Sequence, residues 1–396
     1  MPALLIISQV YPPDPAAVGQ YLEDEARARV RDGWSVTVIT ANRGYDDPSV
    51  VYPRREERHG VRVIRLGGSS WGKASLLRRL LGQFFFLIQA VLKAGVGRRY
   101  DHVLVSTSPP MAGLAGVALR RLRGTPFTWW VMDLNPDQAV ALGAFRPDHP
   151  LARLFDGFNE ATLRLAARVV TLDRFMAARL EAKYPPAAER IGVVPPWPLE
   201  GLEDAVPPAE NPFRHAHGMD GRRVLAYSGN HSVAHPLTTL LDAIDRCRED
   251  DRLCFAFIGG GKGKAEVEAR AKASGWSEVR VKLLPYQPLD QLRYSLSAGD
   301  VHVVSMGERM VGCVHPCKFY GALALGRPIL YLGPQASHIG ECISREAIGW
   351  QCDHGDVDRM ESIIQEIAAL PEERLATMGE NARRLVRERF VRQAII

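Results

Sequence analysis

The sequence predicts an α/β fold built from two doubly wound domains, on three observations. The chain has 396 residues, more than one hydrophobic core usually serves. Short apolar runs alternate with helical patterns, as in residues 4–7, 21–32 and 34–40, and this order of strand, helix and strand predicts a parallel sheet. Five prolines then interrupt residues 185–198, and polar turns continue to residue 221. This stretch predicts a linker between two domains.

We therefore expect a first domain over residues 1–195 and a second over residues 196–380. Further strands of the first domain are predicted at 102–106, 128–132 and 169–172, and helices at 160–167 and 175–184. Strands of the second domain are predicted at 224–227, 253–258, 279–283, 301–305 and 329–332. Because parallel sheets bind ligands at the carboxyl ends of their strands, functional residues are expected in the loops that follow these runs.

The two halves of the chain differ in charge. Residues 1–199 hold 26 Lys and Arg against 18 Asp and Glu, a net charge of +8, whereas residues 200–396 hold 24 against 27, a net charge of −3. The basic half should meet an anionic partner. No nucleic acid is expected, because the sequence lacks a motif in which aromatic and basic residues interleave. A membrane surface or a phosphorylated lipid suits the charge better.

Six cysteines, all in the second half, are spaced irregularly and form no C-x-x-C pair. This pattern predicts buried, reduced thiols in a cytoplasmic protein. The alternative for Cys313, His315 and Cys317 is the start of a metal site. No further residues complete a zinc-ligand spacing, so we expect no metal. The first residues lack a basic segment and run directly into an apolar stretch, which predicts a strand rather than a signal peptide.

Residues 71–99 form an unusually apolar segment of the first half. Phe84, Phe85 and Phe86 stand together, and six basic residues flank them without one acidic residue. The uninterrupted apolar part is shorter than the ~20 residues that span a bilayer. Two interpretations stay open: a basic interfacial helix lying on anionic lipid, or a core helix with solvated basic ends. The first would place the protein peripherally on the inner face of the membrane.

Residues 311–334 combine a glycine- and proline-broken turn, a short helix and an apolar run typical of a buried strand. A loop that opens a helix presents unpaired backbone N–H groups and partial positive charge, which suit phosphate oxygens. Lys318, in the first turn of this helix, adds a flexible positive charge for a diphosphate. The alternative is an ordinary loop, helix and strand with a surface lysine.

Two carboxylates follow the predicted strand at 128–132. Asp133 and Asp137 lie in the loop at its carboxyl end, so both are candidates for a general base or for orienting a substrate. The alternative for Asp137 is to cap the next helix. In the first loop of the chain, Gly19 either lets the backbone approach a ligand closely or merely eases a turn.

The order of motifs along nearly the whole chain resembles the family 4 glycosyltransferases, and among them the branch of O-antigen and colanic acid assembly. The matching segments are, in order, Tyr11-Pro12-Pro13 with Gly19, residues 133–137 with Ala141-Leu142-Gly143, Tyr227-Ser228-Gly229-Asn230, residues 257–261, Leu284-Pro285-Tyr286 and residues 316–328. Members of this family are retaining enzymes of two facing Rossmann-like domains with a cleft between them, the GT-B fold. The resemblance also implies a C-terminal helix within 381–396 that crosses back to the first domain.

The resemblance implies that the second domain holds most of a nucleotide-diphosphate sugar, expected to be a UDP-sugar. Residues 284–287, which include Pro285 and Tyr286, would face the nucleobase through backbone groups, and Gly312, Val314 and Lys318 would face the diphosphate and the sugar. Gly19 would let the first domain approach the donor phosphates. The remaining donor-binding candidates are Gly229, Asn230, His231, His235 and His315.

This sequence departs from the family's pattern at the donor site. Family members carry glutamates, one of which grips the ribose hydroxyls, where this sequence has Cys313 and Gly321. An arginine and a lysine that flank the diphosphate are replaced by Asn230 and His235. Lys318 would then be the main cation, assisted by nearby histidines when they are protonated.

The expected function is that of a retaining glycosyltransferase that moves a sugar to a lipid-linked or polysaccharide acceptor in cell-surface glycan biosynthesis, without a cofactor or a metal. Lys318 would stabilise the departing diphosphate. Asp133, which lies near the place of a histidine common in the family, and Asp137 would orient hydroxyl groups. Two other functions stay open: a nucleotide-sugar epimerase of the same architecture, and a non-catalytic protein that binds nucleotide sugars.

Overall fold

The computed structural model describes residues 1–396 except 45–46, 69–75, 203 and 248. The described chain separates into two compact units. Unit 1 consists of Met1–Pro195, Gly312–His315 and Gln393–Ile396, and unit 2 consists of Pro196–Val311 and Pro316–Arg392. Each unit has its own sheet of mainly parallel strands and its own hydrophobic core. The predicted fold class, α/β with two doubly wound domains, is confirmed.

The described part of unit 1 is built on an eight-stranded sheet in the order β3-β4-β2-β1-β5-β6-β7-β8. All its neighbours pair in parallel except β3 and β4. The strands are β1 (Ala3–Ile7), β2 (Ser35–Ala41), β3 (Arg55–Arg58), β4 (Val61–Leu66), β5 (His102–Val105), β6 (Phe127–Trp130), β7 (Arg168–Thr171) and β8 (Ile191–Val193). The strand order reverses between β1 and β5, so the loops after these strands lie where such sheets bind ligands.

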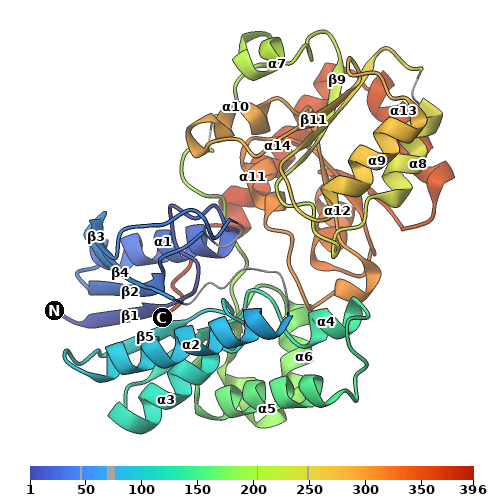
Figure 1. Ribbon diagram of the computed structural model, residues 1–396. Helices are drawn as coiled ribbons and strands as arrows, with labels where there is room; N and C mark the ends of the chain where they lie inside the picture. The colour runs from blue at the N-terminus through green and yellow to red at the C-terminus, as the bar shows by residue number, and fades with distance from the viewer. Residues whose placement is uncertain (45–46, 69–75, 203, 248) are drawn as a thin grey trace. The chain divides into compact units, whose positions relative to one another are not determined.

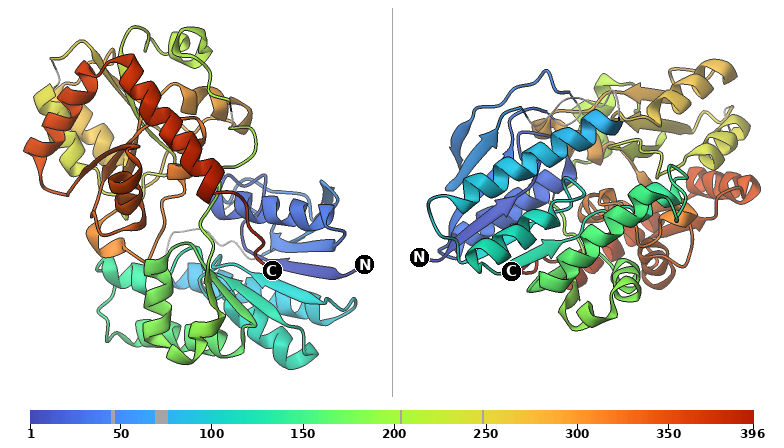
Figure 2. Two further views of the ribbon diagram at one scale, coloured as in Figure 1. Left: turned by 180° about the vertical axis from the view of Figure 1, so that it is seen from behind. Right: turned by 60° about the horizontal axis from the view of Figure 1, so that its bottom comes forward.

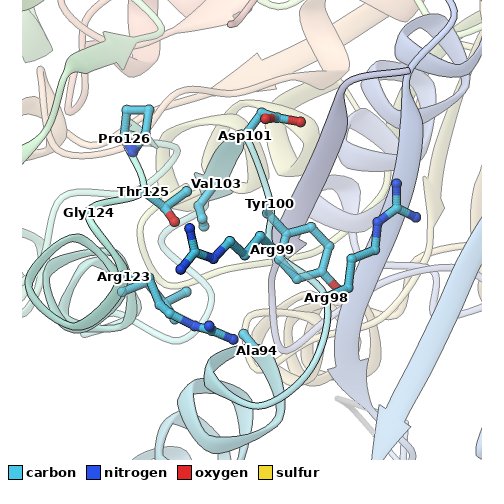
Figure 3. A pocket seen from close by; sticks show the side chains of 11 residues that line it. Ala94, Arg98, Arg99, Tyr100, Asp101, Val103, Arg123, Gly124, Thr125 and Pro126 are labelled. Atoms are coloured by element: carbon cyan, nitrogen blue, oxygen red, sulfur yellow. The ribbon is translucent and has the colours of Figure 1, made fainter.

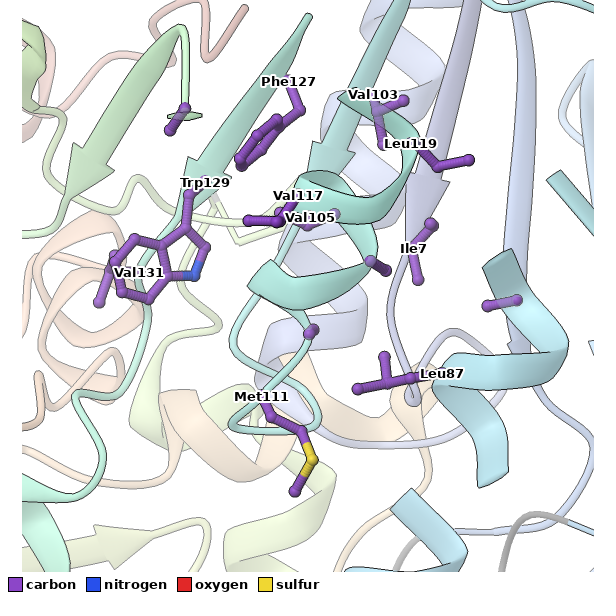
Figure 4. Close-up of a cluster of buried hydrophobic side chains, with 14 of the residues drawn as sticks. Ile7, Leu87, Val103, Val105, Met111, Val117, Leu119, Phe127, Trp129 and Val131 are labelled. Atoms are coloured by element: carbon purple, nitrogen blue, oxygen red, sulfur yellow. The ribbon is translucent and has the colours of Figure 1, made fainter. Parts of the chain in front are cut away.

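Helices cover both faces of the unit 1 sheet, with α1 on one face and α2 and α3 on the other (Figure 1). The core between the sheet and α2 and α3 is filled by large side chains that include Leu87, Phe127 and Trp129 (Figure 4). The helices of unit 1 are α1 (Ala17–Arg31), α2 (Leu76–Gly95), α3 (Gly113–Arg123), α4 (Asp137–Ala141), α5 (Pro150–Leu165), α6 (Arg174–Lys183) and the 3-10 helix η1 (Pro185–Arg190).

Unit 1 differs from the sequence-based expectation at several elements, among them strands β4 and β8, which were not predicted. The helix expected over 160–167 begins at Pro150, because proline suits the first helical position and the His149 ring accepts a hydrogen bond from the Leu151 N–H at 3.2 Å. Strand β3 was not predicted because its residues are all charged, which is typical of a protected sheet edge. Helix α3 was missed because its first turn is made of small residues.

Helix α2 has two apolar faces. One face packs into the unit 1 core through Phe86, Leu87, Ala90 and Ala94, as the core-helix interpretation predicts. The other face exposes large apolar side chains at helical spacing: Leu81, Phe84, Phe85, Ile88 and Leu92. Within the described chain, no helix is both long and apolar enough to cross a bilayer. Residues 71–75 of the segment expected here lie outside the described residues.

The described part of unit 2 is built on a six-stranded sheet in the order β11-β10-β9-β12-β13-β14, in which all neighbours pair in parallel. The strands are β9 (Arg223–Ser228), β10 (Leu253–Ile258), β11 (Val281–Leu284), β12 (Val301–Ser305), β13 (Ile329–Leu332) and β14 (Gly349–Cys352). The order reverses between β9 and β12. The loops after β9 and β12 are therefore where this sheet should bind a ligand.

The helices of unit 2 surround this sheet, with α8 and α13 packed on the main core. They are α7 (Pro212–Ala216), α8 (Thr238–Cys247), α9 (Lys264–Ser274), α10 (Leu292–Ser297), α11 (Lys318–Ala324), α12 (His338–Glu346), α13 (Val357–Ala369) and α14 (Glu372–Arg389), with the 3-10 helices η2 (Pro208–Glu210), η3 (Leu289–Gln291) and η4 (Glu308–Met310). Helix α14 runs as one long helix, shown in red in Figure 2.

Two segments do not follow the expected domain division. Residues 312–315, expected in the second domain, cluster with unit 1, where the Leu134 N–H donates to the Cys313 carbonyl at 2.7 Å. The expected crossing helix within 381–396 is the end of α14, which belongs to unit 2 because Phe390 packs on Tyr320 at 4.9 Å between ring centroids. Gln393–Ile396 alone belong to unit 1 at this end of the chain.

Candidate functional site

Lys318 lies at the switch point of the unit 2 sheet. It is the first residue of α11, and its Nζ lies 3.4 Å from the centroid of the Tyr227 ring near the end of β9. Gly229 follows that strand with a φ of +113°, and a Cβ there would lie 3.8 Å from Cε of Lys318. A glycine is therefore required for the turn, and its lack of a side chain leaves room beside the amine.

The Lys318 amine is buried without a hydrogen-bond partner in the described structure. Burial holds the pKa of Lys318 well below its usual range. A buried amine without a partner destabilises the folded state unless an anion joins it. This atom is therefore the clearest sign of an anion site in unit 2.

Two histidines of the loop after β9 add to this site. The Nε2 of His231 and the Nδ1 of His235 are also buried without a hydrogen-bond partner among the described residues. Burial, and then the charge of Lys318, lower the pKa of His231 to about 4 and that of His235 to about 3. Both rings are therefore neutral near pH 7, and a bound anion is needed before they contribute positive charge.

Hydrogen bonding indicates which tautomer the neutral His231 ring adopts. Its Nδ1 lies 3.1 Å from the Gly229 carbonyl oxygen, which only accepts, so Nδ1 carries the proton. Nε2 is then an acceptor that can receive a hydrogen bond from the Lys318 ammonium or from a sugar hydroxyl.

The loop after β9, which includes Asn230, packs on the glycines at 259–261. The Asn230 carbonyl accepts from the Tyr227 hydroxyl at 3.0 Å, and a Cβ on Gly261 would lie 2.2 Å from the Asn230 side-chain oxygen. A Cβ on Gly259 would lie 2.1 Å from the Gly229 carbonyl oxygen. These glycines are needed because the loop after β9 packs directly against them.

Pro285 and Tyr286 follow β11. Tyr286 is 45% exposed, and its ring packs on Gly260, where a Cβ would lie 2.9 Å from the ring. The Leu284 carbonyl already accepts from the Gly259 N–H at 2.9 Å. The exposed Tyr286 ring, rather than that carbonyl, is the surface this loop offers to a flat base.

Gly321 stands where the resemblance implies a ribose-binding glutamate. A Cβ at Gly321 would meet Leu202 at 3.4 Å and Leu296 at 3.9 Å. This position therefore faces apolar side chains, which offer nothing to the hydroxyls of a ribose.

In unit 1, polar side chains gather after β5, β6 and β7. The Thr107 hydroxyl accepts from the N–H groups of Met132 and Asp133, both at 3.1 Å. Burial raises the pKa of Asp133 to about 6, and the nearby His315 partly opposes this shift. Asp133 thus lies at the carboxyl edge of the sheet, as its position after a strand predicts.

His315 is buried next to Asp133 and is held by Asp173. Its Nδ1 lies 2.8 Å from Oδ2 of Asp173, whose other oxygen accepts from the Met176 N–H at 2.8 Å and caps α6. An Asp that orients an imidazole in this way fixes which ring nitrogen carries the proton. His315, predicted to bind the donor, is therefore placed among the residues of unit 1.

Gly312 and Val314 are placed in unit 1 with His315. Gly312 has a φ of +73°, and a Cβ there would lie 2.7 Å from the Phe175 carbonyl oxygen. Val314 is buried. Of the three residues predicted to face the diphosphate and the sugar, only Lys318 belongs to unit 2. Because α11 has seven residues, its dipole adds little to the charge of Lys318.

Asp137 and Gly19 contact other parts of unit 1. Asp137 opens α4 and pairs with Lys183 at 2.6 Å and Arg179 at 3.7 Å, and Lys183 also contacts Asp156. The two ion pairs hold the Asp137 carboxylate in place at the start of α4. A Cβ on Gly19 would lie 3.1 Å from the Tyr11 Cα, so the helix start packs closely on its own loop.

Three residues of these sites were not singled out from the sequence: Tyr227, Thr107 and Asp173. Asp173 follows a predicted strand immediately, which is the same signal that selected Asp133. Tyr227 reads as an ordinary buried strand residue, so its contact with the Lys318 amine has no signature in the sequence.

Within the described residues, no three His, Cys, Asp or Glu side chains come together in a way that could hold a metal ion. Cys313 is buried in unit 1, and burial raises the pKa of its thiol to about 11. This thiol is protonated at neutral pH and is therefore a weak metal ligand.

Comparison with known proteins connects both units to sugar transfer. Residues 16–197 match the model of the glycosyl transferase 4-like domain. The chain is 26% identical over 392 residues to the probable glycosyltransferase WbjE of Pseudomonas aeruginosa, covering 98% of this chain and 94% of that protein. It is 25% identical over 404 residues to the putative colanic acid biosynthesis glycosyl transferase WcaI of Escherichia coli K12, covering 99% and 98%.

Solved structures share the fold over the full length. Sucrose-phosphate synthase of Thermosynechococcus elongatus has a TM-score of 0.78 at 18% identity, covering 100% of this chain and 96% of that one. Anabaena HepE in complex with UDP and glucose has a TM-score of 0.71 at 17% identity, covering 98% and 95%. The chain has the GT-B fold of these proteins.

Proposed function

Since residues 16–197 match the model of the glycosyl transferase 4-like domain and nearly the whole chain is similar to WbjE and WcaI, we propose that it transfers a sugar from a nucleotide-diphosphate sugar, a UDP-sugar, to a lipid-linked or polysaccharide acceptor. The name of WcaI, a putative colanic acid biosynthesis glycosyl transferase, supports a role in cell-surface glycan biosynthesis. HepE, which shares the fold, was solved with UDP and glucose, and this supports the choice of donor.

The observation that carries this proposal is the buried Lys318 amine with two unpartnered imidazole nitrogens at the switch point of unit 2. When a diphosphate enters, its charge raises the pKa of Lys318 and of both rings. The amine then stabilises the charge that develops as the diphosphate leaves the sugar, and does so most strongly where water is excluded. In this proposal neither a metal nor a cofactor takes part, and the sugar keeps its anomeric configuration.

In unit 1 we assign the acceptor side to Asp133. Its carboxylate can accept a hydrogen bond from an acceptor or sugar hydroxyl, and its pKa of about 6 lies close to the pH at which it would exchange a proton. The His315 ring lies near the Asp133 carboxylate and is itself held by Asp173. Asp137, tied to Lys183, helps to position the loop rather than to move a proton.

The experiment is incubation of the protein with a panel of nucleotide sugars, with and without a membrane lipid extract, followed by measurement of released nucleotide and of the donor. We expect release of UDP from one UDP-sugar that depends on the extract. Isomerisation of the donor without release would replace transfer by epimerisation. Binding of UDP-sugars without turnover under every condition would leave a binding protein.

We also propose that the exposed apolar face of α2 lies on a membrane. Leu81, Phe84, Phe85, Ile88 and Leu92 form one continuous strip on this helix. Arg78, Arg79 and Lys93 flank it, and the segment holds no acidic residue. Exposed apolar side chains between basic residues favour binding at the surface of anionic lipid. A peripheral position would bring the enzyme to a lipid-linked acceptor.

A further inference from the structure

A pocket of about 290 Å³ opens at the other end of the unit 1 sheet from Asp133. It lies where β5 and β6 begin and where α2 and α3 end. We call it the arginine pocket, and its rim and floor are formed by Arg98, Arg99, Tyr100, Arg123, Thr125 and Leu119, among others. Its volume is at the lower end of that of small-molecule sites, roughly 300 Å³.

The arginines around this pocket are not neutralised. Arg98 donates to the Ser35 hydroxyl at 2.8 Å, Arg123 to the Gly97 carbonyl at 3.3 Å, and Arg120 to the Gly124 carbonyl at 2.6 Å. In the part of the chain that the structure describes, these arginines, Arg99 and Arg121 form no ion pair. Elsewhere on unit 1, arginines such as Arg29 and Arg65 pair with carboxylates.

The carboxyl ends of α2 and α3 do not carry enough negative charge to balance these arginines. The carboxyl termini of α2 and α3 carry roughly −0.5 charge each, and basic residues in a last turn complement them. The lone carboxylate of the pocket, Asp101, adds one negative charge and accepts from the Ala3 N–H at 2.7 Å. Three guanidinium groups of the pocket lining and two more in the last turn of α3, against two helix ends and one carboxylate, leave an excess of about +3. Arg98 and Arg99 also lie beyond both helices.

The arrangement of the side chains suits a phosphate. Arg99 and Arg123 lie around the same opening near Thr125, whereas Arg98 extends away from them (Figure 3). Guanidinium groups bind phosphate oxygens through paired N–H donors, and the Thr125 hydroxyl lies in the same lining. The floor is apolar, with Ala94, Val103 and Leu119. A phosphate that carries an apolar group would contact both the arginines and the apolar floor.

We propose that the arginine pocket is a second anion site, which binds the phosphoryl group of a phosphate-bearing ligand. This site is independent of the proposed sugar transfer, because no residue of the pocket belongs to the donor or acceptor groups described above. The ligand is either a soluble phosphate compound or the headgroup of an anionic lipid. Exposed Val96 and Leu122 beside the arginines make the lipid a natural source.

The first arm of the test is calorimetric titration with inorganic pyrophosphate. The wild-type protein should bind at two sites, and Lys318→Met should keep one. The double variant Arg99→Gln/Arg123→Gln should keep the other, and its affinity in the arginine pocket should fall by about tenfold or more. Arg99→Gln alone, which removes a side chain without a hydrogen bond in the described structure, guards against a folding defect. The matched control is Arg62→Gln/Arg153→Gln, which removes two exposed, unpaired arginines of unit 1.

The second arm identifies the source of the phosphate by co-sedimentation with vesicles of phosphatidylcholine alone or mixed equally with phosphatidic acid. Binding that needs phosphatidic acid and falls in Arg99→Gln/Arg123→Gln, but not in the control, assigns a lipid headgroup. Pyrophosphate binding without such a loss assigns a soluble ligand. The proposal is overturned if neither probe distinguishes the arginine pocket variants from the control. Because Lys318→Met reports on the donor site alone, failure of either proposal is visible separately.

Discussion

At the scale of single residues, the Lys318 amine of unit 2 lowers the stability of the fold and serves the proposed transfer. The Lys318 amine is buried against Tyr227 and has no hydrogen-bond partner in the described structure. A sequence selected for stability alone would place an apolar side chain there. Sites that keep a costly group without a local partner are where ligands are expected.

Lys318→Met should therefore stabilise unit 2 and impair transfer. Removal of the buried amine should raise the free energy of unfolding of unit 2 by about 1–3 kcal/mol. The same change should lower kcat/KM for the donor by about 10²-fold or more, because one preorganised charge at the leaving group is lost. Urea unfolding and steady-state kinetics check both effects. Lys262→Met, which removes an exposed lysine of unit 2, is the control, and equal kinetics in the two variants would refute the assignment.

Asp133 makes a second prediction, which depends on pH. Burial raises its pKa from 3.8 to about 6 in the folded protein. Between these values the folded state binds more protons than the unfolded chain, so stability falls as the pH rises through this window and the deficit persists above it. Asp133→Asn should thus raise the free energy of unfolding by about 1–2 kcal/mol near neutral pH, since partial exposure moderates the effect, and by almost nothing below about pH 4.

Transfer activity should respond to the same titration. If the carboxylate orients a hydroxyl, activity of the wild-type protein should decline as the pH falls through about 6, whereas the low residual activity of Asp133→Asn should lack this step. The pH profile of kcat/KM separates this role from a structural one. A variant with wild-type activity and an unchanged profile would remove Asp133 from the mechanism.

At the scale of elements, α2 shows how one helix can serve two environments. Its inner face joins the unit 1 core through residues such as Phe86 and Leu87, and its outer face exposes Phe84 and Leu92. The two faces cannot be told apart in the sequence, because a helix with apolar residues on both sides shows no amphipathic pattern. The structure separates them by burial, so the two interpretations of this segment are not exclusive.

The outer face of α2 can be tested with paired charge substitutions. Phe84→Glu/Leu92→Glu should reduce co-sedimentation with anionic vesicles about tenfold, because two apolar anchors are lost and negative charge is added. Val51→Glu/Leu154→Glu changes two other exposed apolar residues of unit 1, 58% and 49% exposed, by the same charge. Equal losses in both variants would indicate a general effect of charge rather than a face of α2. Neutralisation of Arg78 and Arg79 should weaken binding further.

At the scale of the whole molecule, the chain consists of two units whose main cores share no residue. Separate cores favour separate unfolding transitions, because each unit can lose its packing without the other. UDP should raise the midpoint of one transition only, by an amount equivalent to about 2.7 kcal/mol at a hundredfold excess over its Kd. Differential scanning calorimetry of the full chain measures this. In Lys318→Met the shift should disappear, and an equal shift of both transitions would contradict a donor site confined to unit 2.

Much of the fold and part of the candidate site could be predicted from the sequence. The alternation of apolar runs and helical patterns predicted five strands of each sheet, because period and burial are local properties of the chain. Positions after strand ends predicted Asp133, and the turn before a short helix predicted Lys318. Strand β3 and helix α3 were missed because a charged edge and a helix start of small residues lack the expected patterns.

The sequence by itself determined the fold class, the resemblance to a family of sugar-transferring enzymes and the cation of the proposed donor site. Only the tertiary structure decided which groups surround each of these residues. It placed Gly312, Val314 and His315 in unit 1, joined His315 to Asp173, and set Gly321 against Leu202. It also left the Lys318 amine and the arginines of the arginine pocket without an ion pair in the described chain. The reason is physical: patterns along a chain report periodicity and charge, whereas partners, burial and pKa depend on residues that folding brings together from distant positions.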